Sequence, residues 1–175
     1  MSNKQNQPPS DFPASPVSKP RPVFIYGTLC AMPLLAWVLT GDALNVSAVS
    51  TLTQPAKVYG YARFLVRNCD YPAVVSHDAQ TAVDGFLLTF EANSLRKRLD
   101  IFEGEAYKPA TVAVTLLNAD GSPDEETVEA DMYLWAGDAH ALTAEPWQLD
   151  NFVKGRLTDW LNIFDGMELM DDDWE

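Results

Sequence analysis

The stretch Val23–Leu29, VFIYGTL, decides the fold of this chain, and CAMP over 30–33 follows it directly. Its first half is a short run of apolar, β-branched and aromatic residues, which predicts a strand. Gly27 then breaks the run and lets another molecule approach the main chain closely. Apolar residues recur at helical spacing beyond Pro33. The stretch therefore predicts a strand, a tight turn with exposed N–H groups and a helix start, which suits an anionic ligand. The alternative is an ordinary strand-to-helix connection that contains a glycine.

The composition is typical of a soluble globular protein. The chain has 175 residues and a formal net charge of −13, from 25 acidic and 12 basic residues. This charge argues against binding to nucleic acid or to an anionic membrane surface. No apolar run is long enough to cross a bilayer, and no leader is recognisable. With only two cysteines, Cys30 and Cys69, we expect a cytoplasmic protein without a disulfide framework.

The chain divides into three parts. We expect a disordered, proline-rich tail over 1–20, one folded domain over 21–165 and an acidic tail over 166–175. The first tail lacks the apolar residues that would offset the entropy of ordering it. The acidic run Asp171–Asp173 is typical of a solvated end.

Strand patterns outnumber helix patterns, which favours an α+β domain with a mixed sheet. After the first strand, we expect strands over 58–66, 71–75, 83–90, 107–117 and 127–135, with turn residues at 54–55 and a bulge or close contact at Gly60. We expect helices from Pro33 to a cap at Gly41, from a cap at Asn93 or Ser94 to Gly104, and from Glu145 through Leu161 as one last amphipathic helix.

Glu103 is the sharpest candidate for chemistry. It ends an apolar helix face, next to Phe102 and directly before Gly104. Apolar neighbours disfavour a charged carboxylate and make it a better base near neutral pH. The alternative is a solvated glutamate at a helix end. Asp100 can share the same helix face, whereas we expect Glu105 to point to solvent.

Two tyrosines can contribute to such a site. Tyr107 can offer a phenol hydrogen bond, although a strand tyrosine more often fills core space. Tyr71 precedes Pro72, which restricts the backbone so that the ring can form a pocket wall.

The sequence gives little support for a catalytic cysteine or for a metal site. A catalytic thiol needs a base, and nothing in the sequence pairs His77 or His140 with Cys30. The same two histidines lie outside any cluster with ligand spacing, so we expect no metal site. We also find no phosphate loop, dinucleotide fingerprint or serine elbow.

Three motifs in order carry a family resemblance. They are YGTL at 26–29, DYPAV at 70–74 and LDIFEGEAY at 99–107. Together they resemble the γ-glutamylcyclotransferase-like family, which includes γ-glutamylamine cyclotransferases and the plant avirulence-induced proteins. The resemblance covers about residues 22 to 164. It implies a small, partly closed β-barrel flanked by helices, with the ligand cavity at one mouth.

The resemblance also implies a reaction. The substrate's own α-amino group attacks its γ-carbonyl carbon, which releases 5-oxoproline and an amine or amino acid, without metal or cofactor. Glu103 matches the family's catalytic glutamate. The resemblance implies that the small-molecule substrate is bound by Tyr26, Gly27, Thr28, Leu29, Cys30, Ala31, Tyr71 and Tyr107.

One position departs from the family pattern. Many relatives have arginine where this chain has Pro109, which puts the leaving-group preference in doubt. Two other functions stay open: a binding or interaction protein without turnover on the same fold, and a hydrolase that uses Glu103 to activate water. The leaving amine and the oligomeric state are also left open.

Overall fold

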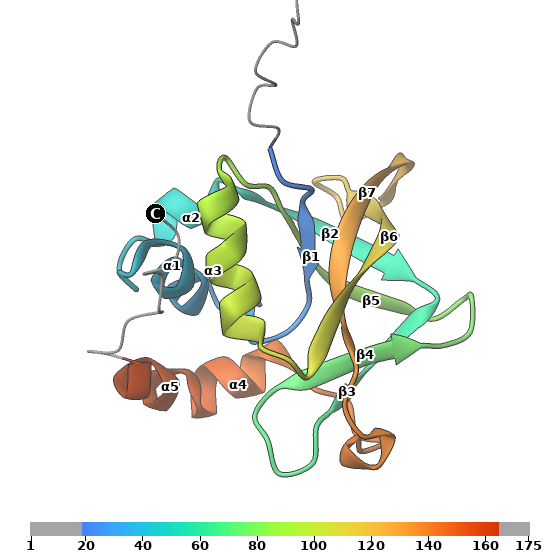
Figure 1. Ribbon diagram of the computed structural model, residues 1–175. Helices are drawn as coiled ribbons and strands as arrows, with labels where there is room; N and C mark the ends of the chain where they lie inside the picture. Colours follow the sequence, from blue (N-terminus) through green and yellow to red (C-terminus); the bar gives the residue numbers. More distant parts are fainter. Residues whose placement is uncertain (1–18, 165–175) are drawn as a thin grey trace, which may run out of the picture.

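The computed structural model describes residues 19–164, and in it five strands close into a barrel with helices along one side (Figure 1). The two expected tails, over 1–20 and 166–175, lie outside the described residues except for residues 19 and 20. The elements, in chain order, are β1 (Val23–Ile25), the 3₁₀ turn η1 (Thr28–Cys30), α1 (Met32–Thr40), α2 (Val46–Ser50), β2 (Thr53–Tyr59), β3 (Tyr61–Leu65), β4 (Pro72–Ser76), β5 (Ala82–Leu88), α3 (Asn93–Glu103), β6 (Tyr107–Leu117), β7 (Pro123–Trp135), the 3₁₀ turn η2 (Ala139–Ala141), α4 (Leu149–Gly155) and α5 (Leu157–Phe164).

The barrel has the strand order β1-β5-β2-β6-β7. Its neighbours pair antiparallel, except that β1 and β7 are parallel and close the barrel where Val23 lies opposite Asp131. Strands β3 and β4 form a separate two-stranded sheet below the barrel. The expectation of an α+β fold with a mixed barrel flanked by helices is confirmed, and the barrel is closed rather than partly closed.

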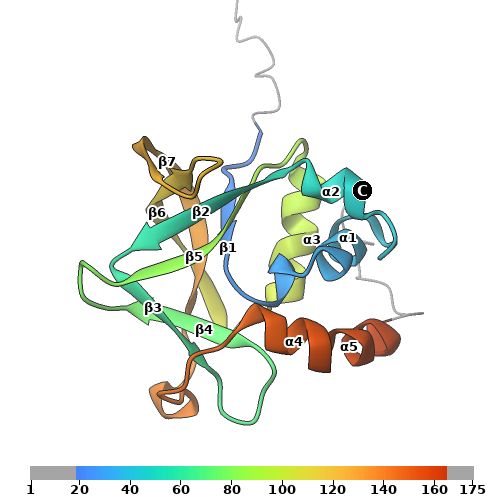
Figure 2. The same ribbon diagram turned by 180° about the vertical axis from the view of Figure 1, so that it is seen from behind.

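The first strand separates two apolar cores because its side chains alternate between its faces. Val23 and Ile25 pack with α1, α3 and the C-terminal helices, whereas Phe24 and Tyr26 point into the barrel interior. Figure 2 shows the helices gathered on one side of β1. The stretch 23–26 therefore joins the helical layer to the barrel.

The strand–turn–helix prediction around Gly27 is confirmed. After β1 the chain makes η1 and then enters α1 with Pro33 in its first turn. Gly41 caps α1 in the left-handed conformation, with φ of 80°, as expected. Strands β4, β5, β6 and β7 also lie where the sequence pattern predicts them, with shifts of a few residues at their ends.

Two predictions about strands are wrong. The strand expected over 58–66 is two strands, because Gly60 has a φ of 89° and turns the chain from the barrel into the separate β3–β4 sheet. Pro55 is not in a turn but within β2, opposite Phe86 of β5.

Three details of the helices also differ from prediction. Helix α3 begins after Ala92, and neither Asn93 nor Ser94 forms a cap. The last helix is divided at Arg156 into α4 and α5. The short helix α2 was not predicted, since its five residues are too few to show a helical period. No helix in residues 19–164 combines the length and apolar character that a bilayer span requires.

Candidate active site

A cavity of about 280 Å³ opens where the barrel meets the helices. The end of α3, the turn after β1, the starts of β4 and β6, and helix α5 surround it, and these elements converge in the lower half of Figure 1. Its lining residues are Phe24, Ile25, Tyr26, Gly27, Thr28, Leu29, Tyr71, Pro72, Phe102, Glu103, Ala106, Tyr107, Tyr133, Trp160 and Phe164.

Glu103 is the only formally charged residue among the described residues that line this cavity. It is the last residue of α3, and Gly104 ends the helix with a φ of 76°. Burial disfavours the carboxylate, and the nearby charge of Asp100 adds to this effect, so that the pKa of Glu103 rises to about 8. A group with this pKa can accept and return a proton near neutral pH.

Asp100 belongs to a polar network directly behind Glu103. Its carboxylate accepts hydrogen bonds from the Tyr133 hydroxyl and from Arg96 Nε, the latter at 3.0 Å. Arg96 also donates to Asp131 of β7 at 2.8 Å. The network fixes the last turns of α3 against the barrel, and it keeps a negative charge near Glu103.

The turn after β1 forms the opposite wall of the cavity. Tyr26 is buried, and its hydroxyl donates to the main-chain oxygen of Tyr133 at 2.5 Å. Arg63 donates to the main-chain oxygen of Tyr26 at 2.8 Å, which fixes the peptide that leads into Gly27. The first N–H groups of the following helical turn have no acceptor within that turn, so they are available to a ligand.

Tyr71 and Tyr107 both line the cavity and are tied to neighbouring elements. The Tyr107 hydroxyl donates to the main-chain oxygen of Pro72 at 2.8 Å, and burial followed by the charge of Glu103 raises its pKa. A hydrogen bond with Cys69, together with burial, raises the pKa of Tyr71 to about 12. Both phenols therefore stay neutral near physiological pH.

Cys30 and Ala31 are not brought to this cavity. Their N–H groups donate within the turn, to Gly27 and Thr28 oxygens at 2.9 and 3.0 Å. The Cys30 side chain instead lines a second cavity of about 470 Å³, on the other side of Tyr26. Burial raises the pKa of its thiol to about 12, which opposes a nucleophilic role.

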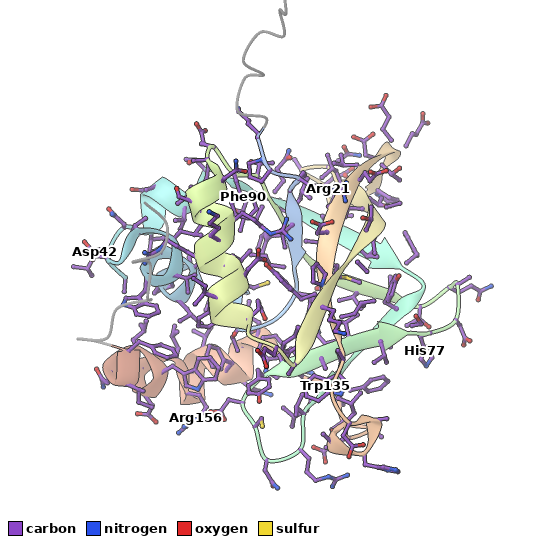
Figure 3. All side chains as sticks on the ribbon, in the orientation of Figure 1. Arg21, Asp42, His77, Phe90, Trp135 and Arg156 are labelled. Atoms are coloured by element: carbon purple, nitrogen blue, oxygen red, sulfur yellow. The ribbon has the colours of Figure 1, made fainter. Side chains whose placement is uncertain are left out.

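Other candidates lie away from the cavity. Glu105 is exposed. His77 lies at the far end of β4 (Figure 3), where its ring contacts Thr81 and Phe64. His140 is in η2. No group of three or more His, Cys, Asp or Glu side chains within residues 19–164 is arranged to hold a metal.

Four residues of the site were not singled out from the sequence. Tyr133 comes from the last barrel strand, Arg63 from β3, and Trp160 and Phe164 from α5. The sequence patterns around these four residues predict only that they lie on a strand or a helix, and not that they contribute to a site. For Tyr133 and Trp160 the available signal was a hydroxyl or an indole N–H within an apolar pattern, since such groups need a hydrogen-bond partner when buried. No such signal marked Arg63 or Phe164.

The comparisons with known proteins agree on one family. A model of the family described as "Gamma-glutamyl cyclotransferase, AIG2-like" matches residues 23–150. The chain therefore belongs to this family. It is 28% identical over 113 residues to Protein AIG2 C of Arabidopsis thaliana, which is 65% of this chain and 60% of that relative.

Solved structures support the fold. One solution structure of an Arabidopsis thaliana protein has a TM-score of 0.55 and 25% identity, over 86% of this chain and 84% of that one. A second solution structure from the same organism has a TM-score of 0.53 and 20% identity, over 86% and 95% of the two chains. The second comparison supports the fold alone.

Proposed function

We propose that this protein is a γ-glutamyl cyclotransferase that releases 5-oxoproline and a free amine or amino acid from a γ-glutamyl compound. The observation that carries the proposal is Glu103, which faces the cavity with a pKa raised to about 8. A protein that only binds a ligand has no evident need for such a costly carboxyl. Membership of the family supports this reaction class.

The turn after β1 holds the glutamyl end of the substrate. This end carries a carboxylate, and no lysine or arginine lines the cavity in the described part of the chain. Backbone N–H groups of the Gly27–Leu29 turn, together with the hydroxyl groups of the lining residues Thr28 and Tyr71, are the donors that remain for it. They also stabilise the negative charge that develops on the γ-carbonyl oxygen during the attack.

Glu103 moves the proton. Its carboxylate takes a proton from the substrate's α-ammonium, and the freed amine attacks the γ-carbonyl carbon of the same molecule. A new C–N bond closes the five-membered ring, Glu103 passes its proton to the leaving nitrogen, and the bond from the γ-carbon to that nitrogen breaks. The Glu103 carboxylate then takes the second proton that the ring nitrogen must lose and passes it to the released amine, which leaves as an ammonium. Because attacker and target belong to one molecule, the cavity mainly has to hold the substrate in its folded shape.

The test is product analysis with purified protein and a panel of γ-glutamyl amines and γ-glutamyl amino acids. We expect release of 5-oxoproline by the wild type and a loss of at least about a hundredfold in Glu103→Gln, the usual size for removal of a general base. Glu105→Gln is the matched control, since Glu105 lies two residues further on and is exposed.

Two outcomes would replace the proposal. Free glutamate in place of 5-oxoproline would mean that Glu103 activates water and that the protein is a hydrolase. Binding of panel members without any product would mean a ligand-binding protein on the same fold.

A further inference from the structure

One wall of the cavity is aromatic, and helix α5 supplies two of its four residues. Trp160 and Phe164 both line the cavity, next to Tyr71 and Phe102. The rings contact one another: the centroid distance is 6.4 Å between Tyr71 and Trp160, and 6.0 Å between Phe102 and Phe164. We call these four residues, Tyr71, Phe102, Trp160 and Phe164, the aromatic wall.

Asp70 fixes the position of this wall. Its carboxylate oxygen Oδ2 accepts from Trp160 Nε1 and from Arg156 Nε, both at 2.9 Å. Its main-chain oxygen accepts from Trp147 Nε1 at 2.7 Å. Although partial burial acts in the opposite direction, the hydrogen bonds from Trp160 and Arg156 lower the pKa of Asp70. Arg156 lies where α4 meets α5 (Figure 3), so one carboxylate holds both helices and the Trp160 ring.

The chemistry of the cavity divides between its two sides. The turn at Gly27–Leu29 offers backbone N–H groups, and Glu103 offers the one formal charge among the described lining residues. A substrate that places its glutamyl end and attacking nitrogen on these groups directs its remaining part, the leaving amine, toward the aromatic wall. There it finds mainly carbon surface, because Phe102 and Phe164 carry no polar side-chain atom and the indole N–H of Trp160 is already bonded to Asp70.

We propose that α5 determines the leaving group, and that the aromatic wall selects an amine with an apolar substituent over one that carries a carboxylate or a second ammonium. This inference rests on the proposed cyclotransferase function. A carboxylate on the leaving group meets no positive side chain among the described lining residues, and its burial without a partner is costly. A second ammonium loses its hydration against the rings, which costs more than the attraction of the ring faces returns, and the Asp70 carboxylate behind them already accepts from Trp160 and Arg156. An alkyl or aromatic substituent is instead stabilised by burial against the rings.

Glu103 and helix α5 lie on different sides of the boundary of the family match. The family model matches residues 23–150, which include Glu103 and the turn after β1. Helix α5, Leu157–Phe164, lies beyond this segment. Glu103, the group proposed to move the proton, thus lies in the matched segment. Trp160 and Phe164 of the aromatic wall lie outside it.

The test uses four γ-glutamyl substrates that differ only in the leaving amine. These are γ-glutamylpentylamide, γ-glutamylcadaverine, γ-glutamylnorleucine and γ-glutamylmethylamide. The second adds a terminal ammonium to the pentyl chain, the third adds a carboxylate beside the nitrogen, and the fourth removes the chain. We expect kcat/KM for 5-oxoproline release to be at least about tenfold higher for the pentylamide than for each of the others.

Variants connect this preference to the wall. Trp160→Ala should lower kcat/KM at least about tenfold for the pentylamide, mainly through KM, and leave the methylamide within about twofold. Ile163→Ala is the control on the same helix, because Ile163 is 61% exposed and does not line the cavity. A second pair tests the anchor: Asp70→Ala should act like Trp160→Ala, whereas Asp159→Ala, which also removes a partner of Arg156, should not.

Different results overturn different parts. Release of 5-oxoproline without preference for the pentylamide, or with preference for cadaverine or norleucine, overturns the inference and leaves the cyclotransferase intact. An equal loss on pentylamide and methylamide in Trp160→Ala would show a structural role and overturn the inference as well. No 5-oxoproline from any of the four substrates, or from the wider panel, overturns the cyclotransferase and this inference with it.

Discussion

The hydroxyl of Tyr133 donates a hydrogen bond to the carboxylate of Asp100, one turn before Glu103 on helix α3. Tyr133 lies on the last strand of the barrel and is 4% exposed. The bond therefore ties the helix that ends in Glu103 to the barrel wall. It also keeps the charge of Asp100 near Glu103, where it adds to the effect of burial on the Glu103 pKa.

Removal of the Asp100 charge should change the pH dependence of the reaction. Glu103 must be ionised to take a proton, so kcat/KM rises as the pH passes through its pKa, which lies at about 8. In Asp100→Asn the contribution of burial stays and that of the like charge is lost. We expect the acid limb of the kcat/KM profile to move to lower pH by roughly one unit.

Glu105→Gln is the control for this shift, since it removes one negative charge from an exposed neighbour in the chain. A profile measured over pH 5–10 with one γ-glutamyl substrate is sufficient. If Asp100→Asn left the limb in place, or moved it to higher pH, the Asp100 carboxylate would have no part in setting the Glu103 pKa.

Glu103 should also make the folded protein less stable in alkaline solution. Its pKa rises from 4.5 to about 8 on folding, so its contribution to stability is fully present below about pH 4.5 and is lost as the pH rises through 8. Glu103→Gln has no such loss. We expect it to be more stable than the wild type by a few kcal/mol at pH 9, a difference that becomes small near pH 5.

Urea denaturation of both proteins at these two pH values measures the difference. Glu105→Gln, at an exposed position, should stay within about 0.5 kcal/mol of the wild type at both. An equal stability of wild type and Glu103→Gln at pH 9 would mean that the Glu103 carboxylate is solvated in the folded protein.

The sequence pattern predicted the parts of this fold that depend on neighbouring residues. The run before Gly27, the glycine cap at Gly41 and the alternation over 107–117 each have a local cause, and the structure has each element in place. Gly60 was predicted to mark a bulge or a close contact, because a glycine inside a strand pattern has several local meanings. Only the three-dimensional structure distinguishes these meanings, because it shows the chain leaving the barrel at Gly60 and entering the separate β3–β4 sheet.

The candidate site was harder to predict where its residues come from distant segments. Tyr71, Glu103 and Tyr107 were named and all line the cavity. Trp160 was read as part of one amphipathic helix, because its partner Asp70 lies 90 residues earlier and no spacing rule joins them. The family resemblance implied that Cys30 and Ala31 also bind the substrate, yet their N–H groups donate within the 3₁₀ turn.

Two glycines of the barrel and the turn should respond differently to alanine. A Cβ at Gly85 would lie 2.1 Å from the main-chain oxygen of Ile25, so one strand would have to move away from the other. We expect Gly85→Ala to lower the free energy of unfolding by more than about 3 kcal/mol, or to prevent folding. Soluble yield and urea denaturation measure this effect.

At Gly27 a Cβ would meet Pro72 side-chain atoms at 3.0 Å, which the ring can relieve by a small shift. We expect Gly27→Ala to fold with a loss of about 1 kcal/mol and to lose at least about tenfold in kcat/KM, because the shift moves the cavity wall. A Gly85→Ala protein as stable as Gly27→Ala would contradict the close approach of β1 and β5.

Arg63 should control the turn that faces Glu103 without touching the cavity. Its guanidinium donates to the main-chain oxygens of Tyr26 and Asp84 at 2.8 and 2.9 Å and lies 5.6 Å from the centroid of the Trp147 ring. A lysine ammonium cannot reproduce this planar set of donors. We expect Arg63→Lys to cost about 1–2 kcal/mol in stability and to lower kcat/KM about tenfold.

The matched control is Asp84→Asn, which weakens the ion pair at 2.8 Å but leaves the bond from Arg63 to Tyr26. Because the Asp84 side chain is 77% exposed, this pair contributes little, and we expect activity within about twofold of the wild type. If Asp84→Asn lost as much activity as Arg63→Lys, the ion pair would matter more than the hydrogen bond to the turn. If neither variant lost activity, the peptide between Tyr26 and Gly27 would hold its orientation through Gly27 and the Tyr26–Tyr133 hydrogen bond alone.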